Sequence, residues 1–142
     1  MPESREPAQR GGPEGVGGWL LLLCGLLLLW HPLTFGLAAS QALNALPLRG
    51  LPLAFLLAGR LLVTAVGIAA GLALLTRRPA AVTLTIAALA ASAAADLFTY
   101  LTPYMPSNRL PGDTIWFVGE SLLYHAAWLM YLVRSIRVRN TY

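Results

Sequence analysis

The run from Trp19 to Trp30 constrains this chain more than any other feature, because eight of its twelve residues are leucine. Apolar residues then continue past His31 and Pro32 to Ala39. About 20 apolar residues in a helix are enough to cross the hydrocarbon core of a bilayer, which is roughly 30 Å thick. A continuous leucine run of this length favours a lipid environment, so the sequence predicts a membrane-spanning helix over residues 19–39.

Three further segments have a similar length and apolar character: residues 51–75, 80–101 and 115–133. Residues 40–50 read as a mixed linker, and residues 102–114 read as a loop rich in turn-forming residues. Only 11% of the chain is charged, whereas a soluble domain has about 25%. The ten-residue alternation of β-barrel strands is not visible. The sequence therefore predicts an all-α, polytopic membrane protein built as a bundle of four transmembrane helices.

The two ends of the chain differ from these segments. Residues 1–18 are polar and rich in glycine and proline, which predicts a disordered cytoplasmic tail. Residues 134–142 contain three arginines and follow the last apolar segment, which predicts a basic cytoplasmic tail. The leader has two arginines against three glutamates and so lacks the basic start of a signal peptide. We expect residues 19–39 to stay in place as a signal-anchor; cleavage near the small residues Gly36 and Ala38 is the alternative.

The arginines predict the orientation of the four helices. An even number of spans places both termini on one side, where seven arginines lie, against two on the other side. The positive-inside rule therefore predicts cytoplasmic N and C termini. The isoelectric point near 9.8 then reflects the arginines that set the orientation of the helices, and we expect no nucleic-acid partner. The predicted basic anchor at the inner interface consists of Arg77, Arg78, Arg134, Arg137 and Arg139.

Three charged residues lie inside the predicted spans: Arg60, Asp96 and Glu120. Charged side chains in the bilayer are costly and often mark functional sites. Their positions along the helices place all three in the outer half of the membrane, at similar depths. One interpretation is a polar pocket in which Arg60 pairs with Asp96, Glu120 or both, and in which a carboxyl group carries a proton. The other is a structural ion pair, with the second acid reaching the outer headgroups.

Two histidines, His31 and His125, fall near the middle of the bilayer on the first and last helices. Histidines from two helices can hold a haem iron. Their estimated depths differ by roughly 6 Å, however. Because Pro32 frees a backbone carbonyl, a local hydrogen bond of His31 is the simpler expectation. We expect no cofactor and no metal site.

Two further patterns concern helix packing. Gly67 and Gly71 form a small-xxx-small motif, for which we expect close packing within the chain, with dimerisation as the alternative. On the last helix, a four-residue spacing places Glu120 and Tyr124 on one face between Trp116 and Trp128. That face either lines a groove or packs against a neighbouring helix.

The sequences at the two ends of the membrane segment resemble a known family. Gly17-Gly18-Trp19-Leu20 opens the first helix, and Tyr131 begins a closing block with Arg134-Ser135, Arg137-Val138 and Thr141-Tyr142. These motifs are similar to those of the domain-of-unknown-function 2569 family of small bacterial membrane proteins. Members often have proline at position 130, lysine at 139 and phenylalanine at 142, where this chain has Met130, Arg139 and Tyr142. The resemblance implies four helices in the inner membrane, cytoplasmic termini and no assigned activity.

The sequence contains none of the phosphate-loop, zinc-protease, nucleophile-elbow or C-x-x-C motifs. We therefore expect no enzymatic activity and favour an accessory or assembly subunit of the inner membrane. Its expected partners are the lipid bilayer and either another membrane protein or a second copy of the chain. The alternative function is a small solute or proton-linked transporter or channel that uses Arg60, Asp96 and Glu120.

Overall fold

The computed structural model describes residues 15–106, 110 and 112–142, and these residues form helices and short connections without a strand. The all-α prediction is therefore confirmed. Most of the predicted disordered tail, residues 1–14, lies outside the described residues. The elements are α1 (Trp19–Gly25), the π-helical turn η1 (Leu26–Trp30), α2 (His31–Leu75), α3 (Ala81–Leu101), α4 (Thr114–Arg134) and α5 (Ile136–Thr141).

Helix α2 folds back on itself at Gly50, whose backbone has φ 63° and ψ −149°. Glycine adopts a positive φ without the steric cost that a side chain would bring. Pro52 follows in the first turn of the returning helix, where proline is tolerated because its missing N–H would have had no partner. Residues 31–49 are called the first arm of α2, and residues 51–75 the second arm.

The prediction of a linker over residues 40–50 was therefore wrong. The helix that begins at Trp19 continues to residue 49, and the chain reverses at the single residue Gly50. Polar residues such as Ser40 and Gln41 suggested a loop, but polarity does not prevent a helix. Ser40, for example, donates a hydrogen bond to the carbonyl of Leu37 within the helix.

The π-helical turn η1 ends at Trp30, two residues before Pro32. Proline has no N–H to donate to the carbonyl of Leu28, four residues earlier, and its ring crowds that carbonyl. Widening of the helix by one residue per turn relieves this crowding, and such π-turns frequently mark functional sites. Here the turn immediately precedes His31, which lines the cleft described below.

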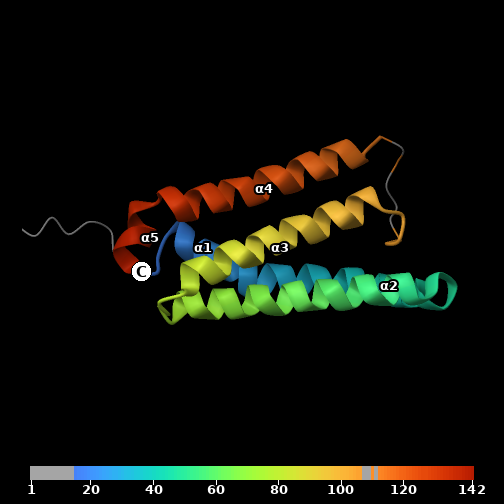
Figure 1. The fold of residues 1–142 in the computed structure, drawn as a ribbon, viewed down its shortest axis with the longest axis horizontal. Coiled ribbons are helices and arrows are strands. Elements are labelled where there is room, and N and C mark those ends of the chain that lie inside the picture. The colour runs from blue at the N-terminus through green and yellow to red at the C-terminus, as the bar shows by residue number, and fades with distance from the viewer. Residues whose placement is uncertain (1–14, 107–109, 111) are drawn as a thin grey trace, which may run out of the picture.

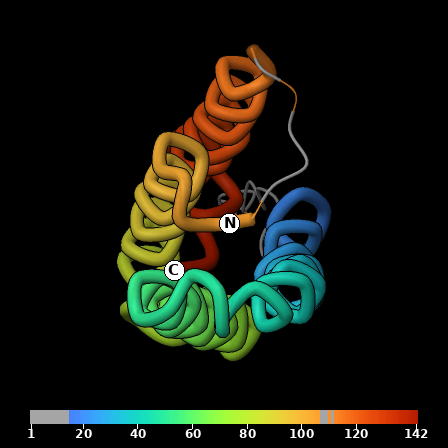
Figure 2. The backbone as a smooth tube through the Cα atoms, turned by 90° about the vertical axis from the view of Figure 1, so that its right-hand side faces the viewer, coloured from blue at the N-terminus to red at the C-terminus, as the bar shows by residue number. Residues whose placement is uncertain are grey.

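The helices form four antiparallel rods: residues 19–49, the second arm of α2, α3 and α4 (Figure 1). The second arm contacts α3, and α3 contacts α4, so rods that follow each other in sequence are neighbours in space. Viewed along their length, the rods follow an open ring whose two ends are residues 19–49 and α4 (Figure 2). We call the end holding Gly15 and Tyr142 the terminal end, and the end holding Gly50 the hairpin end.

The terminal half of the bundle contains a tightly packed apolar core. Its largest members are leucines from all four rods, and they are fully or almost fully buried. The buried hydroxyl of Thr85, on the same stretch of α3, donates a hydrogen bond to the carbonyl of Ala81 in its own helix. The leucines are Leu20, Leu23, Leu27, Leu74, Leu89 and Leu132.

The small-xxx-small motif of Gly67 and Gly71 packs against the first rod in this half of the bundle. A Cβ atom on Gly71 would lie 2.9 Å from Cγ of Leu28 and 3.2 Å from Cβ of Leu27. A Cβ on Gly67 would lie at 3.9 Å from the nearest side-chain atom, which belongs to Leu27. The expectation of packing within the chain is therefore confirmed, and Gly71 is the residue that requires the absence of a side chain.

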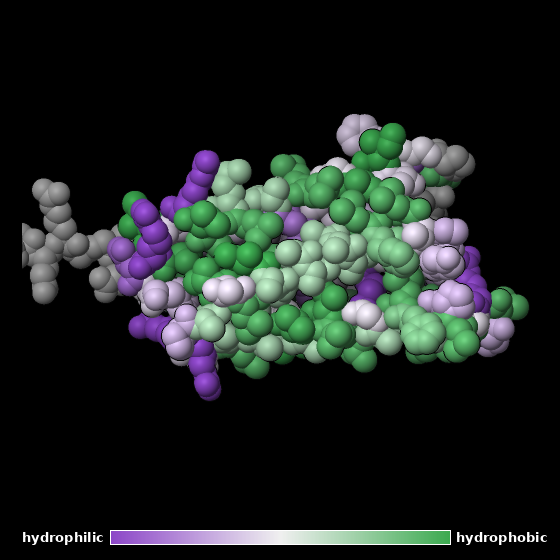
Figure 3. Space-filling model, in the orientation of Figure 1, coloured by the Kyte–Doolittle hydropathy of each residue, from purple (hydrophilic) through white to green (hydrophobic). Residues whose placement is uncertain are grey.

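The outer surface of the bundle is largely apolar. Figure 3 shows hydrophilic residues gathered at the two ends, with mainly hydrophobic residues on the visible face between them. Two helical stretches are long and apolar enough to cross a membrane: Trp19–Leu75, with 57 residues, and Ala81–Leu101, with 21. The first of these contains the reversal at Gly50.

Candidate binding cleft

A cleft of about 510 Å³ opens between the rods on the hairpin side of the leucine core. Its lining comes from the first and second arms of α2, from α3, from α4 and from the connection that follows α3. It contains the three charged residues and the two histidines that the sequence analysis singled out within the predicted spans: Arg60, Asp96, Glu120, His31 and His125. All three charged residues therefore line one cleft.

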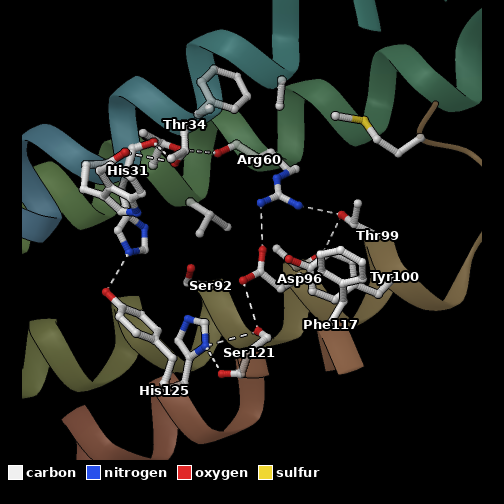
Figure 4. A pocket seen from close by; sticks show the side chains of 18 of the residues that line it. His31, Thr34, Arg60, Ser92, Asp96, Thr99, Tyr100, Phe117, Ser121 and His125 are labelled. Atoms are coloured by element: carbon white, nitrogen blue, oxygen red, sulfur yellow. Dashed lines mark hydrogen bonds and ion pairs between the residues drawn. The ribbon is translucent and has the colours of Figure 1, made fainter. Parts of the chain in front are cut away.

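Arg60 and Asp96 form a direct ion pair across the second arm and α3 (Figure 4). Nη2 of Arg60 lies 2.7 Å from Oδ1 of Asp96, and Nη1 donates a hydrogen bond of 2.7 Å to Oγ1 of Thr99. The other carboxylate oxygen of Asp96 accepts a hydrogen bond of 3.2 Å from the Ser121 hydroxyl on α4. The pair thus connects three helices, and both charges have hydrogen-bond partners in addition to each other.

Glu120 lines the same cleft but is exposed, and among the described residues it has no ion pair. Of the two acids that the sequence offered to Arg60, only Asp96 is therefore paired with it. Glu120 and Ser121 are adjacent on α4, so their side chains differ in direction by about 100°. Ser121 is turned toward Asp96, and Glu120 is an exposed member of the cleft lining.

The two histidines have different surroundings. Nε2 of His31 lies 3.4 Å from the hydroxyl of Tyr124, so the expected local hydrogen bond is replaced by a contact across to α4. Nδ1 of His125 lies 2.7 Å from the backbone carbonyl oxygen of Ser121, one turn earlier on the same helix. Nε2 of His125 is buried and has no hydrogen-bond partner. Figure 4 shows the His125 ring directed into the pocket.

This arrangement does not resemble a haem clamp. The ring of Tyr124 lies beside both histidines, with centroid distances of 6.3 Å to His31 and 5.0 Å to His125. The Nε2 atom of His31 faces a hydroxyl group, where an axial ligand would face iron. Within the described ranges, no group of three or more His, Cys, Asp or Glu side chains is placed to hold a metal ion.

Ser121, His125 and Asp96 are the residue types of a hydrolytic triad, but their hydrogen bonds differ from one. In a triad, histidine accepts the serine proton and donates its other proton to the aspartate. Here the Ser121 hydroxyl lies at 3.2 Å from Asp96 itself, while Nδ1 of His125 faces a carbonyl, which can only accept. Nδ1 therefore carries the proton and is not a base for Ser121, which lies 3.4 Å away.

Several hydroxyl groups in the cleft were not singled out from the sequence: Thr99 and Ser121 bind the ion pair, and Thr34 and Ser92 line the wall. Hydroxyl side chains are common in membrane helices because they can hydrogen-bond to their own backbone. The spacing of these residues relative to Asp96 could have identified them from the sequence. Thr99 follows Asp96 by three residues, which places both on one face of α3.

At the terminal end, the segments that carry the two halves of the sequence motif lie together. The backbone N–H of Gly15 donates a hydrogen bond of 3.0 Å to Oγ1 of Thr141, and the hydroxyl of Tyr142 donates to the carbonyl of Leu74. The rings of Trp19 and Trp128 pack edge to face, with centroids 6.5 Å apart. We call these contacts the terminal clamp.

Residues 134–142 were expected to be a tail, but residues 136–141 form the short helix α5, which packs against the bundle. The burial of Val138, which is 2% exposed, explains this folding despite the flanking arginines. Partial burial also raises the pKa of Tyr142 above its ordinary value, because burial disfavours the charged phenolate. The five arginines of the predicted basic anchor lie on α5, at the end of α4 and in the turn between α2 and α3.

The comparisons with known proteins agree with the motif at the two ends. Residues 13–142 match the family described as "Protein of unknown function (DUF2569)". Neither the curated proteins nor the solved structures contain a match to this chain. The matched region contains all helices and both halves of the terminal clamp, and the chain belongs to the DUF2569 family.

Proposed function

We propose that this chain is a four-pass protein of the bacterial inner membrane, with both termini in the cytoplasm, that acts as a non-enzymatic accessory subunit. The observation that carries the proposal is the cleft. It combines charged and polar groups with apolar and aromatic walls, it is lined by all four rods, and the leucine core lies on its terminal side. Such a cleft is suited to binding, because it offers neither an activated nucleophile nor an open route through the bundle.

The four-pass arrangement is supported by the lengths and surfaces of the rods. Residues 19–49 and the second arm are separate antiparallel helices, so the apolar stretch Trp19–Leu75 has room for two passes. Helix α4 has 21 residues and exposes large apolar side chains such as Leu123 and Val133. The clustering of arginine at the terminal end supports a cytoplasmic location for that end.

The hydrogen bonds of the cleft support a non-enzymatic role. Asp96 is held by Arg60 and Ser121, and the proton on Nδ1 of His125 is directed to a carbonyl, so none of these groups is poised as a general base. The remaining carboxylate, Glu120, is exposed and lines the cleft, where it can meet a bound ligand.

The first prediction concerns the topology. A phosphatase reporter, which is active only outside the cytoplasm, should be inactive when fused after Tyr142 and active when inserted next to Gly50. The reason is that the reversal at Gly50 and the terminal clamp lie at opposite ends of the bundle. A fluorescent reporter that folds only in the cytoplasm should give the inverse result. Phosphatase activity after Tyr142 would contradict the proposed orientation.

The second prediction concerns the accessory role. A photo-crosslinking residue at Gln41, which lines the cleft and is exposed, should form a discrete adduct with another membrane protein in native membranes. The matched control is Leu43, which is also exposed but lies about 200° around the same helix. The expected result is a protein adduct from position 41 that is absent from position 43. Equal labelling at both positions, or no protein adduct from position 41, would contradict the proposal.

Proton-linked transport is the second candidate, and it is favoured by one specific observation. Two carboxylates and two histidines line the same cleft. The leucine core closes this cleft toward the terminal end, so transport would require a second conformation. Proton-driven flux in proteoliposomes that is lost in both Asp96→Asn and Glu120→Gln would favour transport over the accessory role.

A further inference from the structure

The orphaned nitrogen of His125 indicates what kind of group the cleft lacks. His125 is 3% exposed, and its Nδ1 lies 2.7 Å from a backbone carbonyl oxygen. Because a carbonyl only accepts hydrogen bonds, Nδ1 must carry a proton, and in the neutral imidazole Nε2 is then an acceptor. A buried acceptor without a donor is costly. The missing partner of Nε2 is therefore a group that donates a hydrogen bond.

The charges of the cleft add a second requirement. Among the described lining residues, Arg60 carries one positive charge, and Asp96 and Glu120 carry two negative charges, which leaves a formal charge of −1. Arg60 and Asp96 neutralise each other at 2.7 Å, so the excess charge belongs to Glu120. In an environment with fewer water molecules than bulk solvent, an unbalanced carboxylate attracts a cation more strongly than it would in water.

The walls of the cleft fit the same chemistry. Tyr100, Phe117 and Tyr124 present aromatic rings to the cleft, and the rings of Tyr100 and Phe117 lie 5.9 Å apart. Aromatic faces attract cations and also contact apolar groups. A ligand with an N–H donor, a positive charge and an apolar body matches all three observations.

We propose that the cleft binds a primary ammonium group carried on an apolar chain. The ammonium donates a hydrogen bond to Nε2 of His125, and the Glu120 carboxylate supplies its counter-charge. This inference names the ligand class of the proposed binding cleft, and it rests only on the proposed placement of that cleft in the membrane. The ammonium belongs either to a lipid headgroup or to a free amphiphilic amine.

The experiment uses the full chain, labelled with ¹⁵N-histidine, in nanodiscs of phosphatidylcholine, a lipid without a primary amine. The chain has only two histidines, so a His31→Gln variant assigns the signals of both rings. Hexylammonium should shift the Nε2 resonance of His125 in a saturable manner, because it supplies the missing donor. Hexanol has the same chain without a charge, hexyltrimethylammonium has the charge without an N–H, and hexanoate has the opposite charge; all three should produce weaker effects.

Two variants separate the site from general partitioning into the bilayer. Glu120→Gln should weaken hexylammonium binding by about tenfold or more, because the counter-charge is lost. Asp113→Asn removes a carboxylate at the start of the same helix but outside the cleft, and it should bind as the unchanged protein does. An equal response to hexanol, an unaltered affinity in Glu120→Gln, or no shift of Nε2 would overturn the proposal.

A change of lipid then identifies the source of the ammonium. If phosphatidylethanolamine in the nanodisc competes with hexylammonium, the ligand is a lipid headgroup. If it does not compete, the same site takes a free amine. Failure of ammonium binding with the reporter topology intact would reject the ligand class alone. Failure of the reporter topology would reject the proposed function.

Discussion

Replacing Asp96 with leucine should destabilise the folded protein by about 3 kcal/mol, because it leaves the guanidinium of Arg60 without a counter-charge. Loss of one partner from a buried pair costs about 3–5 kcal/mol. The lower end applies here, since the side chains of Arg60 and Asp96 retain 24% and 16% exposure. The measurement is unfolding by dodecyl sulfate in mixed micelles, followed by circular dichroism.

The double variant Arg60→Leu with Asp96→Leu distinguishes a structural pair from a functional one. Removing both charges together should recover most of the lost stability, because a pair of apolar residues carries no desolvation cost. Glu120→Gln is the matched control and should change stability by less than about 0.5 kcal/mol, as expected for an exposed residue. A double variant less stable than Asp96→Leu alone would show that Arg60 stabilises the fold through other contacts, such as Thr99.

Replacing Gly71 with leucine should have a similarly large effect for a different physical reason. Even a Cβ atom at this position would approach Cγ of Leu28 to 2.9 Å and Cβ of Leu27 to 3.2 Å, so a larger side chain must push the first rod away. Overpacking a core typically costs 1–3 kcal/mol. We expect about 3 kcal/mol for Gly71→Leu in the same unfolding measurement, and an intermediate loss for Gly71→Ala.

Gly67→Ala provides the matched control. Its Cβ would lie at 3.9 Å from the nearest side-chain atom, which is ordinary contact, and alanine favours a helix more than glycine does. This variant should therefore be neutral or slightly stabilising. If both glycine variants instead change the oligomeric state in sedimentation experiments and leave monomer stability unaltered, the motif serves dimerisation.

The sequence predicted the helical class and three of the four rods with small errors at their ends, because long apolar runs carry a strong signal. It failed at residues 40–50, where polar side chains suggested a loop while a single glycine was sufficient to reverse the chain. It also failed at residues 136–141, where the burial of Val138 depends on contacts that a local pattern does not contain.

The candidate site was predicted in part. Helical rise placed Arg60, Asp96 and Glu120 at similar depths, but depth does not specify which way each side chain points around its helix. The choice of Asp96 over Glu120 as the partner of Arg60 depends on the relative rotation of the rods. The same limitation applies to His31 and His125, whose connection through Tyr124 requires the packing of α4 against its neighbours.

The terminal clamp has a mechanical consequence for the cleft. It ties α5 and the residues before α1 together and joins Tyr142 to the end of α2, so the first and last rods are fastened to each other at that end. Toward the hairpin end, the first rod and α4 lie on either side of the cleft and both contribute residues to its lining. A movement that widens the cleft would therefore pivot about the clamp, with displacements that grow along the rods toward Gly50. With the clamp as the fixed point, a given rotation of α4 would move its hairpin end furthest. The length of α4 would therefore determine how far the cleft can open.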